Sequence, residues 1–200
     1  MILAGSTMEF NTSPFSIGDV ALGGIIAYIL QPGDPGYDPA VQHGLVISQF
    51  GPVGITPATE FAFWSPASGY VTGLSSTLGQ GYNNTDQIIT QTINNIIYPA
   101  GYCWNLTENG YSDWFLPNYA EMYKVWTNRS LLGVWNTTTP PIAEGYWGSS
   151  QFNDTGIPAP DPNGNVTNLR WSNGISFSYA KRLSCPLGCD RPWVMPMRYF

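Results

Sequence analysis

The chain has 200 residues and a formal net charge of −6, with 10% of its residues charged and 14% aromatic. This length suffices for one sizeable core, and the 22 glycines and 17 prolines are typical of a loop-rich domain packed around aromatic side chains. All seven Lys and Arg residues lie after residue 123 without forming a run, which argues against nucleic acid as a partner, and no apolar stretch reaches the ~18 residues that would predict membrane insertion.

A β-hairpin is expected near the start of the chain. The run "IIAYIL" at 25–30 is β-prone, and a second apolar run follows in "HGLVISQF" at 43–50. The segment between them, 31–42, is dense in Pro, Gly and Asp, which predicts a loop. We expect Asp34 and Asp38 to accept hydrogen bonds from nearby backbone N–H groups rather than to hold a cation.

The spacing of the apolar residues then changes to that of a helix. Within "NTDQIITQTINNIIYPAG" four isoleucines fall at i, i+4, i+7 and i+8, which is the spacing of one helix face. Thr85 or Asp86 is expected to cap the start of this helix, and Pro99 with Gly101 to end it. The predicted apolar face consists of Ile89, Ile93, Ile96 and Ile97.

A second helix is predicted directly behind the segment "SDWFLP" at 112–117. Asn118 can accept hydrogen bonds from the free N–H groups as the N-cap, and Glu121 stands three residues later, as in a capping box. Pro117 favours an extended conformation for the residue before it. The expected buried face comprises Tyr119, Met122, Tyr123 and Trp126, packed on the same core as Trp114 and Leu116.

Beyond residue 133 the pattern becomes that of short strands separated by turns. β-prone runs occur at 146–152, at 166–183 and again in the last ten residues. The pairs Asn163-Gly164 and Asn173-Gly174 are typical of tight hairpin turns. The last third is therefore expected to be an antiparallel sheet with long excursions, and the chain as a whole an α+β fold.

The cysteine and histidine residues form no pattern typical of a metal or catalytic centre. Cys103 stands alone and is expected to be a small buried hydrophobic residue. Cys185 and Cys189 could close a short loop or remain reduced, and no histidine lies near them, so a zinc site is not expected. His43 is the one histidine, and no serine, cysteine or carboxylate can be placed beside it from the sequence. We therefore expect no cofactor, no metal and no enzymatic activity.

Several segments, taken in order, resemble one known family. They are "IGDVALGGIIAYIL", "HGLVIS", "LGQGYNNTDQII", "CWNLTENGYSDWFLPNYAEM", "YWGSSQF", "WSNGISFSYAK" and "WVMPMRYF". Over residues 17–200 the chain resembles the C-type-lectin-like domain found at the C-terminus of collagen-like bacterial adhesins. The combination of "GYSDWFLP" before a capped helix with "YWGSS" behind it is the most specific part of this resemblance.

The resemblance implies a C-type-lectin-like fold, with two helices flanking a small twisted antiparallel sheet and long loops that carry the ligand contacts. It divides the chain into an N-terminal docking arm at 1–16 and a lectin-like domain at 17–200. Pro196 and the long proline-rich loop at 157–163 depart from the family pattern, which predicts a remodelled sheet edge and loop. The Glu-Pro-Asn, Gln-Pro-Asp and Trp-Asn-Asp triplets of calcium-dependent lectins do not occur in the sequence, so no calcium site is expected.

A scaffold of this kind suits a binding module that presents aromatic, amide and arginine side chains on its loops. In the favoured stretch, "FSYAKR" next to "RW", alternate residues are expected to face outward, with Phe177 inward. The alternative, that the aromatic residues form the core, is expected for four tryptophans: Trp114, Trp126, Trp147 and Trp171. The predicted ligand-binding residues are Arg170, Ser176, Ser178, Tyr179 and Arg182.

The expected setting is a virion. The first residues lack the basic and apolar regions of a secretory leader, so a phage tail or capsid-decoration protein fits better than an exported adhesin. Residues 1–16 would then dock onto neighbouring virion subunits, a host-surface glycan or protein would be the ligand, and a homo-oligomer is expected. Two alternatives stay open: a bacterial surface adhesin that binds polysaccharide, and a retroelement-diversified protein whose residues 168–185 vary between copies. An enzymatic use of the fold, as in formylglycine-generating enzymes, has only the shared fold in its favour.

Overall fold

The computed structural model describes residues 14–49, 71–133, 146–151, 171–176, 181–186 and 194–200, and of residues 151, 171–176 and 181–186 it describes only the backbone. The elements in chain order are β1 (Val20–Ala21), β2 (Gly24–Ile29), β3 (Gly44–Ser48), α1 (Gly81–Gln91), α2 (Pro99–Asn105), α3 (Tyr119–Thr127), the 3-10 helix η1 (Arg129–Leu131), β4 (Tyr146–Gln151), β5 (Trp171–Ser176), β6 (Lys181–Pro186) and β7 (Met197–Tyr199). The predicted α+β class is confirmed.

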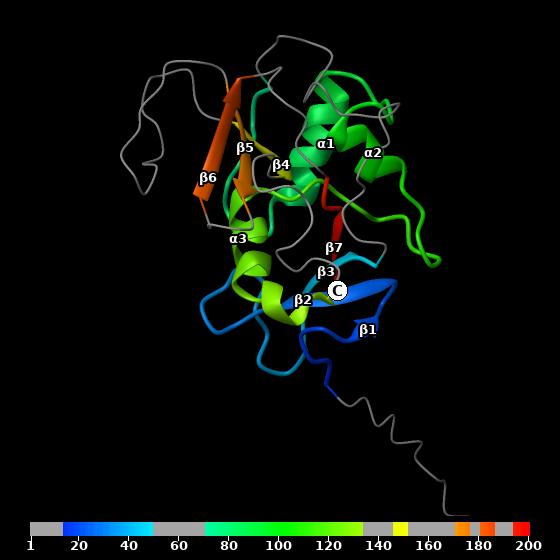
Figure 1. Cartoon of the computed structure of the whole chain (residues 1–200), viewed down its shortest axis with the longest axis vertical. Coiled ribbons are helices and arrows are strands. Elements are labelled where there is room, and N and C mark those ends of the chain that lie inside the picture. The colour runs from blue at the N-terminus through cyan, green and yellow to red at the C-terminus, as the bar shows by residue number, and fades with distance from the viewer. Residues whose placement is uncertain (1–13, 50–70, 134–145, 152–170, 177–180, 187–193) are drawn as a thin grey trace, which may run out of the picture.

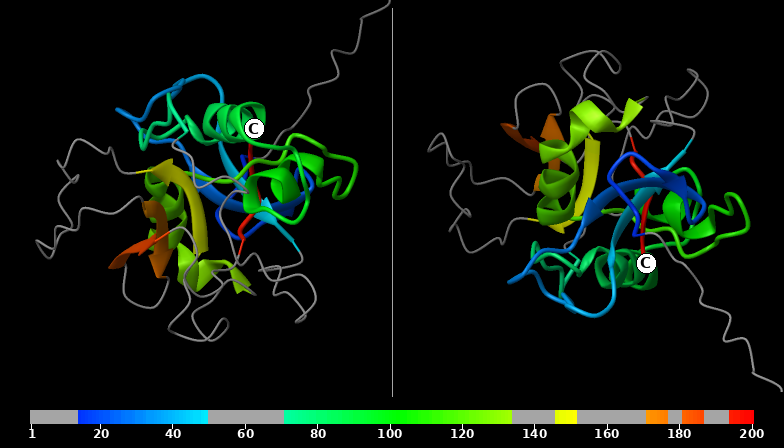
Figure 2. Two further views of the ribbon diagram at one scale, coloured as in Figure 1. Left: turned by 90° about the horizontal axis from the view of Figure 1, so that it is seen from above. Right: turned by 90° about the horizontal axis from the view of Figure 1, so that it is seen from below.

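The strands form two antiparallel sheets on either side of α3. One sheet has the order β1-β2-β3-β7 and the other the order β4-β5-β6. Helix α3 contacts β2 of the first sheet and both β4 and β5 of the second, so it connects the two layers (Figure 1). Helix α1 packs against α2 and β4. Seen from above and from below, the second sheet lies beside α3 (Figure 2).

The predicted hairpin is confirmed, with β2 and β3 paired so that Ile25 lies opposite Ile47 and Ile26 opposite Val46. Alternate residues point to opposite faces of a sheet. Ile26 and Val46 pack with Trp114 on one face, while Ile25 and Ile47 belong to the central cluster on the other. Both faces are therefore covered, which explains why these strands read as continuous apolar runs.

The sequence pattern predicts that the C-terminal run joins the antiparallel sheet of the last third of the chain. The structure instead places this run in the first sheet. Strand β7 pairs with β3, with Arg198 opposite Val46. On its other side Met197 exchanges two backbone hydrogen bonds with Phe115, of 2.7 and 3.0 Å. Strand β7 begins directly after Pro196, whose carbonyl still accepts a hydrogen bond from the Ser48 N–H at 3.1 Å. The last residues thus fill the gap between the hairpin and the segment before α3.

Helix α1 differs from the prediction at both ends. Its N-cap is Gln80, five residues before Thr85, and it stops at Gln91, so Ile93 lies outside it. The residue that anchors α1 is Ile88, which is buried, together with Thr85, which points inward and does not cap the helix. Three of the four isoleucines predicted as its apolar face are exposed: Ile93 by 46%, Ile96 by 62% and Ile97 by 58%.

Pro99 starts a helix instead of ending one. It is the first residue of α2, where a proline's missing N–H costs no hydrogen bond and its fixed φ suits the helix. Cys103 on α2 is fully buried and free, as predicted. The described part of the chain therefore has three α-helices rather than the two predicted.

Helix α3 is confirmed with its capping box. The Asn118 side chain accepts from the Glu121 N–H at 3.1 Å, and the Glu121 carboxylate accepts from the Asn118 N–H at 2.8 Å. The extended segment before it is also confirmed, but it does not bury against a single core. Phe115 packs in the central cluster with α3, whereas Trp114 and Leu116 each belong to a different cluster.

The tight turn predicted at Asn173-Gly174 is wrong, because both residues lie inside β5, opposite Ser184 and Leu183 of β6. Pairing along the whole length of two strands outweighs the local turn preference of an Asn-Gly pair. The other predicted turn, Asn163-Gly164, lies outside the described residues. Of the four tryptophans expected in the core, Trp114 and Trp147 are fully buried, Trp126 is half-buried, and the side chain of Trp171 is not described.

Of the predicted N-terminal arm, residues 1–13 lie outside the described part of the chain. Phe15 is attached to the domain, since its backbone exchanges hydrogen bonds of 2.8 and 3.0 Å with the Gln42 side chain. Its ring meets the ring of Phe200 edge to face, with 5.6 Å between the centroids. Near its end, the predicted arm of residues 1–16 is therefore attached to the rest of the domain through Phe15.

Candidate functional site

Two of the five predicted ligand-binding residues, Ser176 and Arg182, lie in the second sheet. Ser176 ends β5 opposite Lys181, and Arg182 in β6 lies opposite Ile175. The structure thus brings the backbones of Ser176 and Arg182 onto neighbouring strands. Their side chains are not described, so the expected outward orientation stays a prediction. The remaining predicted site residues, Arg170, Ser178 and Tyr179, lie outside the described residues, as does Phe177.

A stack of aromatic rings runs along α3, the helix that packs on this sheet. The rings of Tyr119 and Tyr123 lie 6.2 Å apart at 23°, and those of Tyr123 and Trp126 lie 5.8 Å apart at 21°. The guanidinium carbon of Arg129 lies 4.0 Å from the centre of the Trp126 ring. These four residues stand at i, i+4, i+7 and i+10, so they follow one side of the helix into η1. We call them the aromatic stack.

The aromatic stack is only partly covered by the rest of the chain. Tyr123 is exposed over 42% of its surface, while Tyr119 and Trp126 are half-buried. On the inner side of α3, Met122 and Val125 are fully buried. Met122 and Val125 thus hold the helix to the core, Tyr119 and Trp126 pack partly against it, and Tyr123 stands at the surface, which corrects the prediction that Tyr123 belongs to the buried face.

The geometry of the aromatic stack suits non-covalent binding. The exposed part of Tyr123 offers an aromatic surface to the C–H groups of a sugar or to an apolar side chain, and the Arg129 guanidinium held over the Trp126 ring offers hydrogen-bond donors beside it. Arg129 is held in place because its Nη1 also donates to the Trp126 carbonyl at 3.0 Å. A preformed arrangement loses little side-chain entropy when a ligand arrives.

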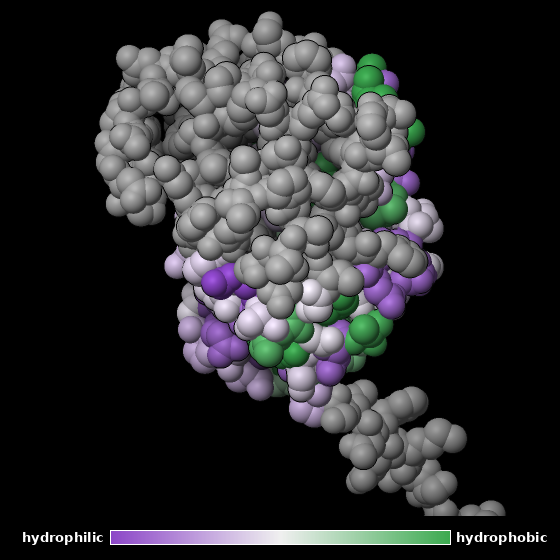
Figure 3. Space-filling view, in the orientation of Figure 1, coloured by the Kyte–Doolittle hydropathy of each residue, from purple (hydrophilic) through white to green (hydrophobic). Residues whose placement is uncertain are grey.

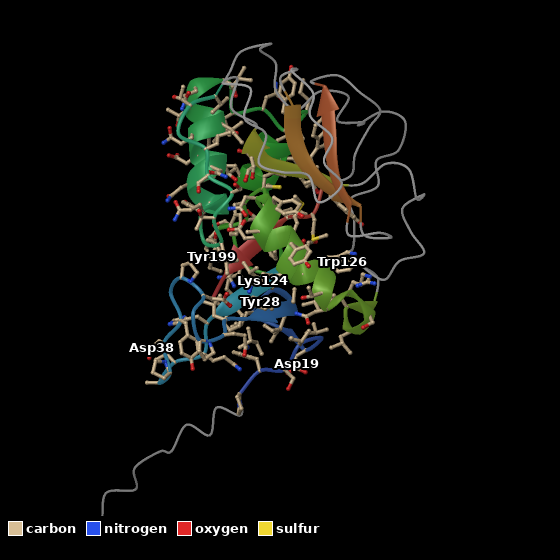
Figure 4. The ribbon with its side chains drawn as sticks, turned by 90° about the vertical axis from the view of Figure 1, so that its left-hand side faces the viewer. Asp19, Tyr28, Asp38, Lys124, Trp126 and Tyr199 are labelled. Atoms are coloured by element: carbon tan, nitrogen blue, oxygen red, sulfur yellow. The ribbon has the colours of Figure 1, made fainter. Side chains whose placement is uncertain are left out.

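Lys124, on another side of α3, ties the helix to the loop after β2, where Figure 4 shows it next to Tyr28. Its Nζ lies 2.8 Å from Asp34 Oδ1 and 2.9 Å from the Tyr28 hydroxyl, which in turn donates to Asp34 Oδ2. Burial alone would raise the pKa of Asp34, but the hydrogen bonds from Lys124, Tyr28 and the Gln31 N–H outweigh it and lower that pKa. The hydrogen bond to Asp34 raises the pKa of Lys124, so the pair stays charged and fixes the loop.

Both aspartates of this loop behave as predicted. Asp34 accepts from the Gln31 N–H at 2.9 Å, and Asp38 accepts from the Ala40 N–H at 2.8 Å. These contacts are local turn contacts. Neither carboxylate is part of a cation site in the described part of the chain.

A buried carboxylate joins the starts of α1 and α3. Oε1 of Glu121 accepts from the Gly79 N–H at 3.1 Å, from the Gly81 N–H at 2.9 Å and from the Tyr199 hydroxyl, while Oε2 accepts from the Asn118 N–H. Burial raises the pKa of Glu121, although these hydrogen bonds oppose the rise. Since both oxygens are engaged by the protein, Glu121 has a structural role.

A half-open cleft of about 410 Å³ lies between the loop that Asp34 ties to α3 and the segment before α1 that Glu121 holds. Its lining is mostly apolar and comes from the loop after β2, the start of β3, the segment before α1 and the end of β7. Its lining residues include Leu30, Pro35, His43, Leu45, Leu78 and Phe200. The sequence pattern did not predict this cleft, because its walls come from four separate parts of the chain.

The described residues offer no metal centre and no reactive thiol. No group of three His, Cys, Asp or Glu side chains among them is placed to hold a metal ion. Burial raises the pKa of the Cys103 thiol well above its ordinary value, which makes it a poor nucleophile. Cys185 lies in β6, where only the backbone is described, and Cys189 lies outside the described residues. No helix in the described ranges is long and apolar enough to cross a bilayer.

Two surfaces therefore stand out, the aromatic stack and the cleft. Across the face drawn in Figure 3, apolar groups of the described residues otherwise form separate spots among polar ones. The sequence does contain a signal for the aromatic stack, since Tyr119, Tyr123 and Trp126 follow a helical period and Arg129 continues it. Periodicity cannot tell an exposed row of rings from a buried one, so the sequence alone predicts a buried face for Tyr119, Tyr123 and Trp126.

Comparison with known proteins adds no functional assignment: no protein-family model matches the chain, and no curated protein is significantly similar to it.

Proposed function

We propose that the chain is a non-enzymatic binding module of C-type-lectin-like fold that contacts a host-surface glycan or protein as part of a virion. The observation that supports binding most directly is the aromatic stack. It places three stacked rings and an arginine along one side of a helix that is anchored in the core, with Tyr123 in the middle of the row exposed. Aromatic and arginine side chains dominate the contact energy of many binding sites.

The position of α3 favours a joint site with the second sheet. The helix packs on β4 and β5, and the predicted ligand residues Ser176 and Arg182 lie on β5 and β6. A ligand on the aromatic stack would then be close to the β5–β6 strands. We propose that these residues, together with Arg170, Ser178 and Tyr179, extend the binding surface.

The ionisable groups in the described residues favour binding over catalysis. Glu121 is fully engaged in capping two helices, and the buried Cys103 thiol resists ionisation. Asp34 is paired with Lys124. The position of each of these groups is thus explained by its burial or by its structural contacts, without a catalytic role.

For the setting we propose a phage tail or capsid decoration in which residues 1–16 dock onto neighbouring subunits and the chain assembles as a homo-oligomer. The anchoring of Phe15 by Gln42 fits such an arm, because it fixes the point from which the preceding residues leave the domain. An adhesin domain on a bacterial surface is the alternative.

The experiment that tests binding compares Tyr123→Ser with Tyr37→Ser on a polysaccharide panel and on whole bacterial cells. Tyr37 is a matched control because it is exposed by 38%, close to the 42% of Tyr123, but lies in the loop after β2. We expect binding to fall by about tenfold or more for Tyr123→Ser, the loss of one central aromatic contact, and to stay unchanged for Tyr37→Ser.

Equal binding by the two variants would contradict a role for the aromatic stack. Mass spectrometry of purified particles tests the setting separately. Detection of the chain in virus particles supports the virion proposal, whereas detection only on bacterial cells supports the adhesin alternative.

A further inference from the structure

We propose that the cleft beside His43 is a second binding site, for an aromatic ring that carries a hydroxyl or N–H donor, as in the side chains of tyrosine and tryptophan. This site goes beyond the proposed function and does not depend on it. Tyr199, which lines the cleft, and Trp126 of the aromatic stack lie toward opposite sides of the view in Figure 4.

The size and lining of the cleft suit an aromatic ring. Its volume of about 410 Å³ lies within the range of roughly 300 to 1,000 Å³ that is usual for small-ligand sites. Leu30, Leu45 and Leu78 supply aliphatic walls, and Tyr199 and Phe200 at the end of the chain also line the cleft. No Lys, Arg, Asp or Glu is among the described residues that line the cleft, and this mostly apolar lining favours an uncharged ligand.

The loop wall of the cleft is rigid. Two consecutive Pro-Gly turns form it, with hydrogen bonds from Asp34 N–H to the Gln31 carbonyl at 2.9 Å and from Tyr37 N–H to the Asp34 carbonyl at 3.1 Å. The glycines of both turns have positive φ, as type II turns require. The ion pair between Asp34 and Lys124 then fixes this loop to α3.

The opposite wall, before α1, is held just as firmly. Glu121 binds the Gly79 N–H, and the Asn118 side chain donates to the Thr77 carbonyl at 2.6 Å. Leu78 therefore projects from a segment that is fixed on both sides. A cleft with two fixed walls needs little reorganisation to accept a ligand.

His43 supplies the selectivity for a donor group. Its Nδ1 lies 3.0 Å from the Phe200 backbone oxygen, and an oxygen of this kind can only accept. The neutral imidazole must therefore carry its proton on Nδ1, which leaves Nε2 as an acceptor. No described residue donates a hydrogen bond to Nε2, so a hydroxyl or N–H group in the cleft would satisfy it.

The test uses the protein's single histidine as its own reporter. With ¹⁵N-histidine labelling, the Nε2 resonance is followed during titrations with p-cresol, 3-methylindole and toluene at constant, mildly alkaline pH. We expect saturable shifts with p-cresol and 3-methylindole, and binding of toluene about fivefold weaker, the ratio for one hydrogen bond of about 1 kcal/mol. No saturable shift with p-cresol, or equal binding of toluene, would overturn the proposal.

Two matched variants place the binding in the cleft. Pro35 lines the cleft and Pro32 does not, yet both are exposed and each holds the same position in its Pro-Gly turn. We expect Pro35→Trp to block p-cresol binding and Pro32→Trp to leave it intact. Retained binding in Pro35→Trp would contradict the assignment, provided that its amide spectrum matches that of Pro32→Trp and so reports an intact fold.

A parallel titration with N-acetyltyrosinamide separates the two sources of such a ring. Binding close to that of p-cresol supports a tyrosine within a polypeptide as the ligand. Binding of p-cresol alone supports a small phenolic molecule.

Discussion

The starts of α1 and α3 differ in where their hydrogen-bond acceptors come from. Helix α3 is capped by its own residues, through the reciprocal pair of Asn118 and Glu121. Helix α1 has no side-chain cap of its own, and the N–H groups of Gly79 and Gly81 are bound by the same Glu121, forty residues further along the chain. A helix start can therefore be a local property or a tertiary one, and only the first kind is visible in a short stretch of sequence.

Replacing Glu121 with alanine should have the largest effect, because it removes the acceptor for both helix starts at once. We expect a loss of about 3 to 5 kcal/mol in the free energy of unfolding, since buried N–H groups are left without partners. Urea unfolding measures the loss, and amide hydrogen exchange at Gly79 and Gly81 locates it. Unchanged protection of those two amides would contradict the shared cap.

The isosteric variant Glu121→Gln separates the two helices. A single amide oxygen can serve either the three donors at Oε1 or the Asn118 N–H at Oε2, so we expect a smaller loss of about 2 kcal/mol. Burial raises the pKa of Glu121, so the folded protein binds this proton more tightly than the unfolded chain. The contribution of this protonation to the free energy of unfolding is full below the ordinary pKa of a glutamate and declines as the pH rises through the raised pKa. The Glu121→Gln variant should lack that decline.

Two isoleucine variants test which side chain holds α1 to the core. Ile88 is 2% exposed and packs with Leu116 and Trp147, whereas Ile93 lies beyond the helix and is 46% exposed. Ile88→Ala should cost about 3 kcal/mol, because it leaves a cavity in the core. Ile93→Ala should change stability by less than about 0.5 kcal/mol. Equal losses of unfolding free energy for the two variants would contradict the observed end of α1 and favour the longer helix predicted from the sequence.

A smaller loss than that of Ile88→Ala is expected at Asp34, the carboxylate that holds the loop after β2 to α3. We expect Asp34→Asn to cost about 1 kcal/mol at neutral pH, because the pair with Lys124 is partly open to solvent. The lowered pKa of Asp34 means that its contribution is present above the ordinary pKa and is lost as pH falls through the lowered value.

The pH dependence of Asp34 is thus opposite in sign to that of Glu121. Unfolding measured from mildly acidic to strongly acidic pH should show the wild type losing its advantage over Asp34→Asn. A constant difference between the two across that range would contradict the proposed charge pairing.

What the sequence predicted correctly depends on signals that lie close together in the chain. The hairpin follows from two β-prone runs around a Pro-Gly loop, and α3 follows from Asn118 and Glu121 three residues apart. The burial of Cys103 follows from its chemistry and isolation. In each case the deciding contacts lie within one element or between neighbours.

The errors concern residues whose partners are distant. The start of α1 depends on Glu121, the position of β7 depends on Phe115 and β3, and the strand conformation of Asn173-Gly174 depends on β6. The cleft at His43 needs four separate segments, so no motif could reveal it. Of the predicted ligand residues, the described backbone places Ser176 and Arg182 on neighbouring strands, and their role remains a prediction.

The pairing of β3 with β7 has a consequence for how this chain tolerates changes in length. Val46 lies opposite Arg198, so most of the chain is enclosed between two strands that are hydrogen-bonded to each other. The entropy lost on closing so long a loop grows only with the logarithm of its length, at about 0.6 kcal/mol per doubling. Insertions of a few residues between β3 and β7 should therefore cost the sheet almost nothing, which leaves the connecting segments free to lengthen or shorten while the strands stay paired.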